Sequence, residues 1–178
     1  MLSLGSFPYP KGRPTARGRR LWVGLAVGLL LPAAVAEAKT SHAGWPEIDG
    51  VLKMHSADQS GVIRGKPNRH NELLGGHGHD TILAGDAGDV LWGDYKEGGQ
   101  PTNQVDRLYG GAGNDFIYAS HGVNYIRTGG GNNIIHAHFG RGSIRCDSPT
   151  DILFISHRSQ PGYRISGCRH ISYKTKRH

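Results

Sequence analysis

The central part of the chain repeats a short polar residue and a branched aliphatic residue with a period of nine. The polar positions are Asn71, Asp80, Asp89, Asp106, Asp115, Asn124 and Asn133, and the aliphatic positions, two residues later, are Leu73, Ile82, Leu91, Leu108, Ile117, Ile126 and Ile135. Ile144 and Leu153 continue the aliphatic series in the same phase. A short fixed period with glycine-rich turns predicts a solenoid of stacked strands, in which the aliphatic side chains point inward. The series is interrupted once, between Asp89 and Asp106.

The turns before the polar positions have the composition of a cation site. In Gly75-Gly76-His77-Gly78-His79-Asp80 the glycines permit backbone conformations closed to other residues, so that carbonyl oxygens can converge on one point. Asp80 adds charge, and calcium prefers a shell of six to eight such oxygens. Because two nine-residue units form one coil, turns are expected to stack on the same edge every eighteen residues, and an ion between neighbouring coils would join them. We expect these oxygens to have no partner other than the ion.

Two stretches, 75–82 and 110–117, fit the pattern G-G-x-G-x-D-x-U-x at every defined position. Through these residues the chain resembles the RTX, or haemolysin-type, calcium-binding repeat family of bacterial secreted proteases, lipases and toxins. The resemblance implies an all-β fold, a right-handed parallel β-roll, that binds Ca²⁺ through aspartates and turn carbonyls. The implied carboxylate ligands are Asp80, Asp89, Asp106 and Asp115, and the implied turn residues are Gly76, Gly78, Gly85, Gly111 and Gly113.

The chain departs from the family pattern in several turns. Ala84 and Ala87 replace two glycines, and Asn124 and Asn133 stand where aspartate is expected. Asparagine brings no charge, although it can hydrogen-bond along a stack. We therefore expect weak or no calcium binding around Asn124 and Asn133. Asp89 and Asp106 lie about one coil apart and are expected to flank one ion.

Four segments are predicted. Residues 1–38 have the features of a signal peptide, because a basic stretch precedes an apolar run and Ala36-Glu37-Ala38 forms a cleavage site after Ala38. Residues 39–70 are interpreted as an N-terminal cap. Residues 71–145 form the calcium-binding β-roll, with a loop at 94–104. Residues 146–178 are interpreted as a C-terminal cap with one disulfide between Cys146 and Cys168, as expected for two cysteines in an exported chain.

Composition limits the classes of partner. The chain is 37% hydrophobic with 28 glycines, so bound ions and repetition are expected to share the stabilisation with a modest core. Without residues 1–38 the chain keeps 16 basic and 13 acidic residues, a charge excess too small and too scattered to indicate nucleic-acid binding. No membrane span is expected after cleavage.

These observations favour a secreted, extracellular, non-enzymatic calcium-binding protein with a role in surface attachment or recognition of a cell-surface or other extracellular partner. One alternative is a transition-metal binder that uses the pairs His77-x-His79 and His136-x-His138. A second is a small hydrolase on a repeat scaffold. Ser120 and His121 are sequence neighbours, however, and the chain has no G-x-S-x-G or H-E-x-x-H motif.

Overall fold

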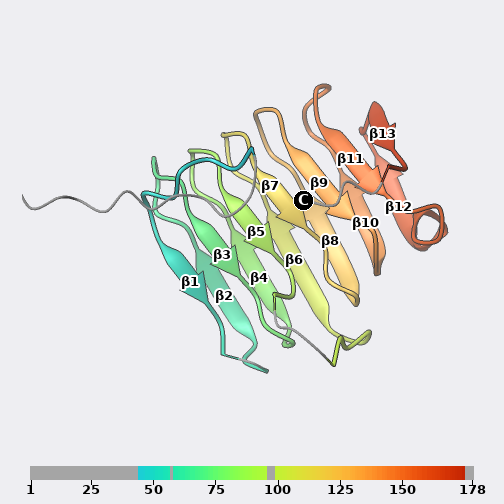
Figure 1. Cartoon of the computed structure of the whole chain (residues 1–178), viewed down its shortest axis with the longest axis horizontal. Helices are drawn as coiled ribbons and strands as arrows, with labels where there is room; N and C mark the ends of the chain where they lie inside the picture. The colour runs from blue at the N-terminus through green and yellow to red at the C-terminus, as the bar shows by residue number, and fades with distance from the viewer. Residues whose placement is uncertain (1–43, 57, 96–98, 175–178) are drawn as a thin grey trace, which may run out of the picture. The chain divides into compact units, whose positions relative to one another are not determined.

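The computed structural model describes residues 44–56, 58–95 and 99–174. The predicted signal peptide and its cleavage site lie outside these residues. The described chain forms an all-β parallel β-roll of about six coils, which confirms the predicted fold class. The strands of each sheet lie side by side along the stack (Figure 1).

Each coil contributes one strand to each of two parallel sheets. Sheet A contains β1 (Leu52–Met54), β3 (Glu72–Leu74), β5 (Val90–Trp92), β7 (Phe116–Tyr118), β9 (Ile134–Ala137), β11 (Ile152–Ile155) and β13 (His170–Ser172), in that order. Sheet B contains β2 (Gly61–Arg64), β4 (Asp80–Leu83), β6 (Val105–Tyr109), β8 (Val123–Arg127), β10 (Arg141–Arg145) and β12 (Tyr163–Ser166), also in chain order. A short 3₁₀ helix, η1 (Gln160–Gly162), precedes β12.

The aliphatic ladder forms the core, as predicted. Side chains alternate along a strand, so the polar residue and the aliphatic residue two positions later both point inward, as in β4, where Asp80 and Ile82 are buried. In-register pairing stacks Ile82 on Leu108 and Leu91 on Ile117. Each such side chain contributes roughly 1.5–3 kcal/mol when fully buried.

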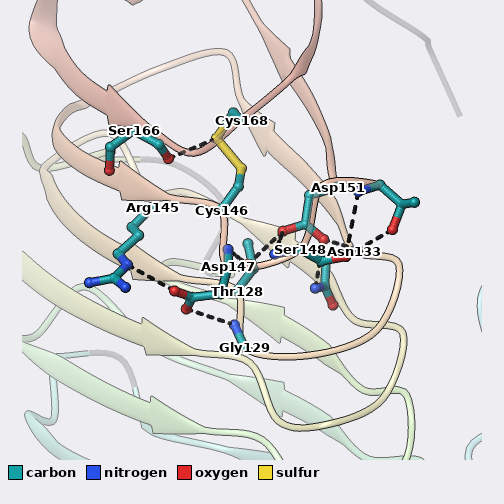
Figure 2. The surroundings of a disulfide bond; sticks show 11 residues. Thr128, Gly129, Asn133, Arg145, Cys146, Asp147, Ser148, Asp151, Ser166 and Cys168 are labelled. Carbon is teal, nitrogen blue, oxygen red and sulfur yellow. Dashed lines mark hydrogen bonds and ion pairs between the residues drawn. A yellow bond between two sulfur atoms is a disulfide. The ribbon is translucent and has the colours of Figure 1, made fainter.

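Residues flanking the predicted repeat continue both sheets. Strands β1 and β2 pair in register with β3 and β4, and Ile63 extends the aliphatic ladder. At the other end, Cys146 and Cys168 form a disulfide, as predicted (Figure 2). The division of the chain into caps and repeat stays a prediction. Among the described residues, no helix has the length and apolar character needed to cross a membrane.

The outer face of sheet A carries an aromatic column. Trp92 stacks on Tyr118 at a centroid distance of 4.0 Å, Tyr118 stacks on His136 at 4.8 Å, and His136 stacks on Phe154 at 5.1 Å. Trp45 covers part of this column and donates a hydrogen bond of 3.0 Å from its ring nitrogen to the Tyr118 hydroxyl. The column is a consequence of in-register pairing, which places equivalent outward positions of successive coils beside one another.

Candidate metal centre

Two columns of acidic and amide side chains run along the roll, one on each edge. We call the turns that lead into sheet A the A edge, and those that lead into sheet B the B edge. The A edge carries Asn71, Asp89, Asp115, Asn133 and Asp151, and the B edge carries Asp80, Asp106 and Asn124; all eight side chains are buried. Each of these residues lies just before a strand or within its first two residues, and its side chain is directed into the roll. The period of nine therefore distributes alternate polar positions to opposite edges.

Each aspartate on the A edge is bound by backbone N–H groups from two coils. The N–H of Asp89 donates to Oδ1 of Asp115 at 2.8 Å, and the N–H of Gly111 donates to Oδ2 of the same carboxylate at 2.8 Å. The N–H of Asn71 likewise donates to Oδ1 of Asp89, and the N–H of Gly85 donates to its Oδ2, both at 2.5 Å. One oxygen thus links neighbouring coils while the other closes its own turn.

The B edge repeats this arrangement in its first coils. The N–H of Asp80 donates to Oδ1 of Asp106 at 3.0 Å, and the N–H of Gly76 donates to Oδ2 of Asp80 at 3.0 Å. Oδ1 of Asp80 lies 2.6 Å from Nδ1 of His55. The expectation that the turn carboxylates have no partner other than an ion is therefore wrong for these aspartates, because backbone and imidazole groups already contact them.

The predicted pairing of Asp89 with Asp106 is also wrong. Asp89 stacks on Asp115 along the A edge, and Asp106 stacks on Asp80 along the B edge, each pair 26 residues apart in sequence. The interrupted step is therefore half a coil with an insertion, rather than one whole coil. The insertion lies between the end of β5 at Trp92 and the start of β6 at Val105, which covers the predicted loop at 94–104.

Close packing between coils explains the glycines of the turns. A Cβ atom added to Gly111 would lie 1.6 Å from the carbonyl oxygen of Gly85 in the preceding coil. Gly129, at φ +76°, lies against the carbonyl of Gly111 in the same way. Of the other predicted turn residues, Gly78 and Gly113 lie against the preceding coil at Gln59 and Ala87. The carbonyl groups of successive turns are therefore close neighbours along each edge.

Burial and like charges raise the pKa values of the carboxyls. Burial raises the pKa of Asp115 to about 7, and the charges of Asp89 and Asp151 add to this effect. Burial raises the pKa of Asp106 to about 7, with further contributions from Asp80 and Asp94. Burial also raises the pKa values of Asp80 and Asp89. Ionised carboxylates stacked in one column repel each other, and a bound cation would relieve that repulsion.

The donor set of the edges fits calcium rather than a softer metal. It consists of carboxylate, amide and carbonyl oxygens, which a hard cation prefers. Among the described residues, no three histidine, cysteine, aspartate or glutamate side chains gather around one point, so an ion would take much of its shell from carbonyl groups. To bind the ion, a carboxylate would give up a hydrogen bond from a backbone N–H group. This holds for each of the four predicted ligands, Asp80, Asp89, Asp106 and Asp115. Calcium would then supply the positive charge that these buried columns need.

Several residues of the columns were missed by the sequence interpretation. Asp151 ends the A edge, where its Oδ1 accepts from the N–H of Asn133 at 3.0 Å and from its Nδ2 at 2.8 Å (Figure 2). Its position eighteen residues after Asn133 was a usable signal. His55 lies outside the repeat, and Gln104 lies in the insertion, with Nε2 3.2 Å from Oδ2 of Asp94. No periodicity marks those two residues.

Asn133 forms the hydrogen bonds along the stack that asparagine was expected to form, whereas Asn124 bonds its own turn and Tyr163. Oδ1 of Asn133 accepts from the N–H of Asp115 at 2.8 Å, and Nδ2 of Asn133 donates to the carbonyl of Gly130 at 2.8 Å. Asn124 accepts from the N–H of Ser120 and donates to the hydroxyl of Tyr163 at 3.1 Å. Amide side chains thus satisfy the same turns without adding buried charge.

The geometry of the histidine pairs and of Ser120 and His121 does not support the two alternatives, a transition-metal site and a hydrolase site. His79 accepts a hydrogen bond from the N–H of Val105, whereas Nε2 of His77 lies 3.6 Å from Asp94, so the two imidazoles of that pair contact different groups. His136 belongs to the aromatic column. Ser120 donates its hydroxyl hydrogen bond to Asn124, and the ring of His121 stacks on Phe139 at 4.3 Å.

A parallel β-roll with acidic, glycine-rich turns on both edges places the described chain in the class of β-roll repeat proteins. Residues 68–94 and 102–135 match the family model of the RTX calcium-binding nonapeptide repeat, in four copies. The repeats are therefore RTX calcium-binding repeats, which confirms the resemblance, and the gap between the two matched ranges falls in the insertion. Neither a curated protein nor a solved structure matches the chain.

Proposed function

We propose that this chain is a secreted, non-enzymatic module in which calcium ions between stacked turns stabilise the roll and keep a surface available for attachment or recognition. The observation that carries the proposal is the A edge, where Asp89 and Asp115 stack in successive coils as buried carboxylates of like charge. The ions would lie between turns on the A edge at Asp89 and Asp115 and on the B edge at Asp80 and Asp106.

Calcium would act by exchange. Backbone N–H groups contact the Asp115 carboxylate, and burial of its charge costs stability. A divalent ion would bring two positive charges and take carbonyl oxygens from adjacent turns, so that ion binding and coil stacking become one equilibrium. An affinity on the order of 10⁻⁴ to 10⁻³ M would suit an extracellular module.

Export fits this linkage. The signal-like segment 1–38, with cleavage after Ala38, would deliver the chain to a compartment where calcium is abundant and where the Cys146–Cys168 disulfide is stable. The roll would then complete its folding outside the cell.

Calcium titration of the mature chain tests the proposal. Isothermal titration should show saturable calcium binding, and the melting temperature measured by circular dichroism should rise from chelator to millimolar calcium. Magnesium at the same concentration should act more weakly, because it demands a smaller octahedral shell. Zinc serves as the competing transition metal. A melting temperature that is identical in chelator and in calcium would contradict the proposal, and tight zinc binding lost on substitution of His136 and His138 would favour the alternative.

A further inference from the structure

The outer face of sheet B concentrates arginine. Outward positions of its strands carry Arg64, Arg107, Arg127, Arg141, Arg145 and Arg164, all exposed. The only acidic residues within these six strands are Asp80 and Asp106, and both are buried. Six of the 16 basic residues beyond residue 38 are therefore gathered on one face, whereas the sequence interpretation described the basic residues as scattered. We call these six residues the arginine face.

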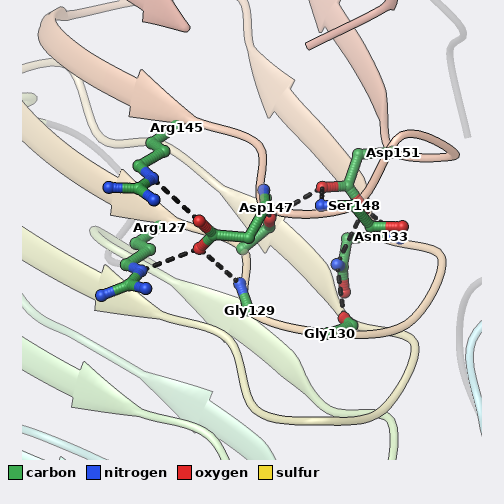
Figure 3. A network of polar contacts seen from close by, with 9 residues as sticks. Arg127, Gly129, Gly130, Asn133, Arg145, Asp147, Ser148 and Asp151 are labelled. Atoms are coloured by element: carbon green, nitrogen blue, oxygen red, sulfur yellow. Dashed lines mark hydrogen bonds and ion pairs between the residues drawn. The ribbon is translucent and has the colours of Figure 1, made fainter. Parts of the chain in front are cut away.

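This face already holds one carboxylate between two of its arginines. Nε of Arg127 lies 2.8 Å from Oδ2 of Asp147, and Nε of Arg145 lies 2.8 Å from Oδ1 of the same carboxylate (Figure 3). The two arginines occupy paired positions of β8 and β10. Arginines of adjacent strands are thus spaced so that one carboxylate bridges them, with one oxygen for each guanidinium.

Further along the same face, the arginines have no such partner. Within the described residues, Arg107 and Arg164 form no ion pair with a carboxylate. The guanidinium of Arg107 lies over the ring of Tyr125, 5.4 Å from its centroid. Tyr125 is itself exposed, so a basic group and an aromatic ring stand together at the surface.

A hollow of about 470 Å³ opens beside this pair. It is lined by Tyr125, Ser143 and Arg164, among others. Gly142 and Gly162 also line it and contribute only backbone atoms. Tyr125, Ser143 and Arg164 lie in β8, β10 and β12, three neighbouring strands of sheet B (Figure 1). The hollow therefore offers an aromatic ring, a hydroxyl and a guanidinium within one site, a combination typical of small polar ligands.

We propose that the arginine face binds an acidic polysaccharide, with one uronate ring in the hollow and further carboxylates along the neighbouring arginines. The C–H face of the sugar would pack on Tyr125, its hydroxyls would bond Ser143, and its carboxylate would pair with Arg164. A flat membrane surface would leave the hollow unfilled. The Asp147 bridge shows that a carboxylate fits between arginines of this face, and a nucleic acid, whose phosphates arginine also binds, is a comparison ligand in the test. The inference rests on the proposed surface role, and it does not depend on which turn residues bind calcium.

Binding of defined anions to the calcium-saturated mature chain tests this inference. The probe is a galacturonate hexamer, short enough to stay in solution with calcium, and its dissociation constant is measured by isothermal titration at low and at physiological salt. A neutral glucose hexamer, a single-stranded oligothymidylate and vesicles of anionic lipid are the comparison ligands. We expect binding of the uronate hexamer that weakens with salt, and little binding of the others.

Variants locate the site. Arg107→Gln with Arg164→Gln should weaken uronate binding by about tenfold per lost charged contact, and Tyr125→Ala should weaken it as well. The matched control is Lys66→Gln with Arg169→Gln, which removes the same charge from exposed positions elsewhere and should change affinity less than about threefold. Circular dichroism and calcium titration of each variant show that the fold and the ion sites are intact.

Three results would overturn the inference. One is no binding of the uronate hexamer by a protein that still binds calcium, which would leave the calcium proposal standing. The second is equal loss in the face variant and the matched control, which would assign the effect to net charge. The third is equal or tighter binding of oligothymidylate or vesicles, lost in the face variant, which would make the face a general anion surface.

Discussion

Replacing Asp115 with asparagine separates the electrostatic cost of the acidic turns from their hydrogen bonds. Burial raises the pKa of Asp115 to about 7, from a usual value of 3.8. Because the folded-state pKa is the higher one, folding favours the protonated carboxyl, and this contribution to stability is fully present below pH 3.8 and is lost as the pH rises through 7. The difference of roughly three pKa units corresponds to about 4 kcal/mol at pH 8 in the metal-free protein.

Asparagine removes that cost but loses one hydrogen bond. Its oxygen can still accept from the N–H of Asp89, whereas its amide nitrogen would face the N–H of Gly111, at a cost of about 1–3 kcal/mol. Asn133 occupies the equivalent place in the next coil, so the turn accommodates an amide. In chelator at pH 8, Asp115→Asn should therefore raise the free energy of unfolding by about 1–3 kcal/mol. At pH 5 the gain should be close to zero.

Urea unfolding monitored by circular dichroism measures this, at pH 5 and 8, in chelator and in millimolar calcium. In calcium the sign should reverse, because the variant loses a charged ligand while the wild-type protein gains the ion. Asp86→Asn is the control. It removes the same charge as Asp115→Asn, but Asp86 is exposed in a neighbouring A-edge turn. A variant that is less stable than wild type in chelator at pH 8, yet keeps the full calcium effect, would refute the reasoning.

Three further outcomes are expected. Calcium binding at pH 6 should release protons, because burial raises the pKa values of Asp106 and Asp115 to about 7 and the ion binds the ionised carboxylates. Calorimetric titration in buffers of different ionisation enthalpy measures the number of protons released, and a value of zero at pH 6 would contradict the prediction. Gly111→Ala should cost at least about 2 kcal/mol in urea unfolding, since its Cβ would overlap a backbone carbonyl, whereas Gly130→Ala, with its nearest neighbour at 3.1 Å, should cost clearly less. Reduction of the Cys146–Cys168 disulfide should lower the free energy of unfolding by about 3 kcal/mol, and an unchanged urea midpoint would show that the C-terminal coils hold without it.

The aliphatic ladder and the sheets were predictable because each depends on one local rule. Inward positions of a strand recur every second residue, and coils recur at a fixed period, so Leu108, Ile126 and Ile144 had to share one line if the chain formed a roll at all. The disulfide followed from cysteine count and expected compartment. None of these inferences requires knowing which coil lies beside which.

Assignment of the ion sites did require that knowledge. The step from Asp89 to Asp106 is one residue short of a coil, and the step from Leu91 to Leu108 is the same, so a whole coil and a half coil with an insertion fit the sequence equally well. The tertiary structure decides for the insertion, because Leu108 pairs with Ile82 in sheet B. As a result, each turn residue after the insertion stacks on a residue of the other edge from the one that a whole coil would give: Asp106 stacks on Asp80 instead of Asp89.

The arginine face was missed because strands of the two sheets alternate along the chain. Outward positions of sheet A carry mainly apolar and aromatic side chains, and those of sheet B carry arginine, so the average composition of the repeat shows neither face. Arg127 and Arg145 are eighteen residues apart and pair in register, and Arg107 pairs with Tyr125 of the same strand as Arg127. Only Arg64, which lies before the insertion, joins this face through the placement of the insertion before β6. Residues beyond 38 carry only 16 basic against 13 acidic residues, yet they present a basic face, because the outward positions of sheet B carry arginines while the turn carboxylates of both edges point inward.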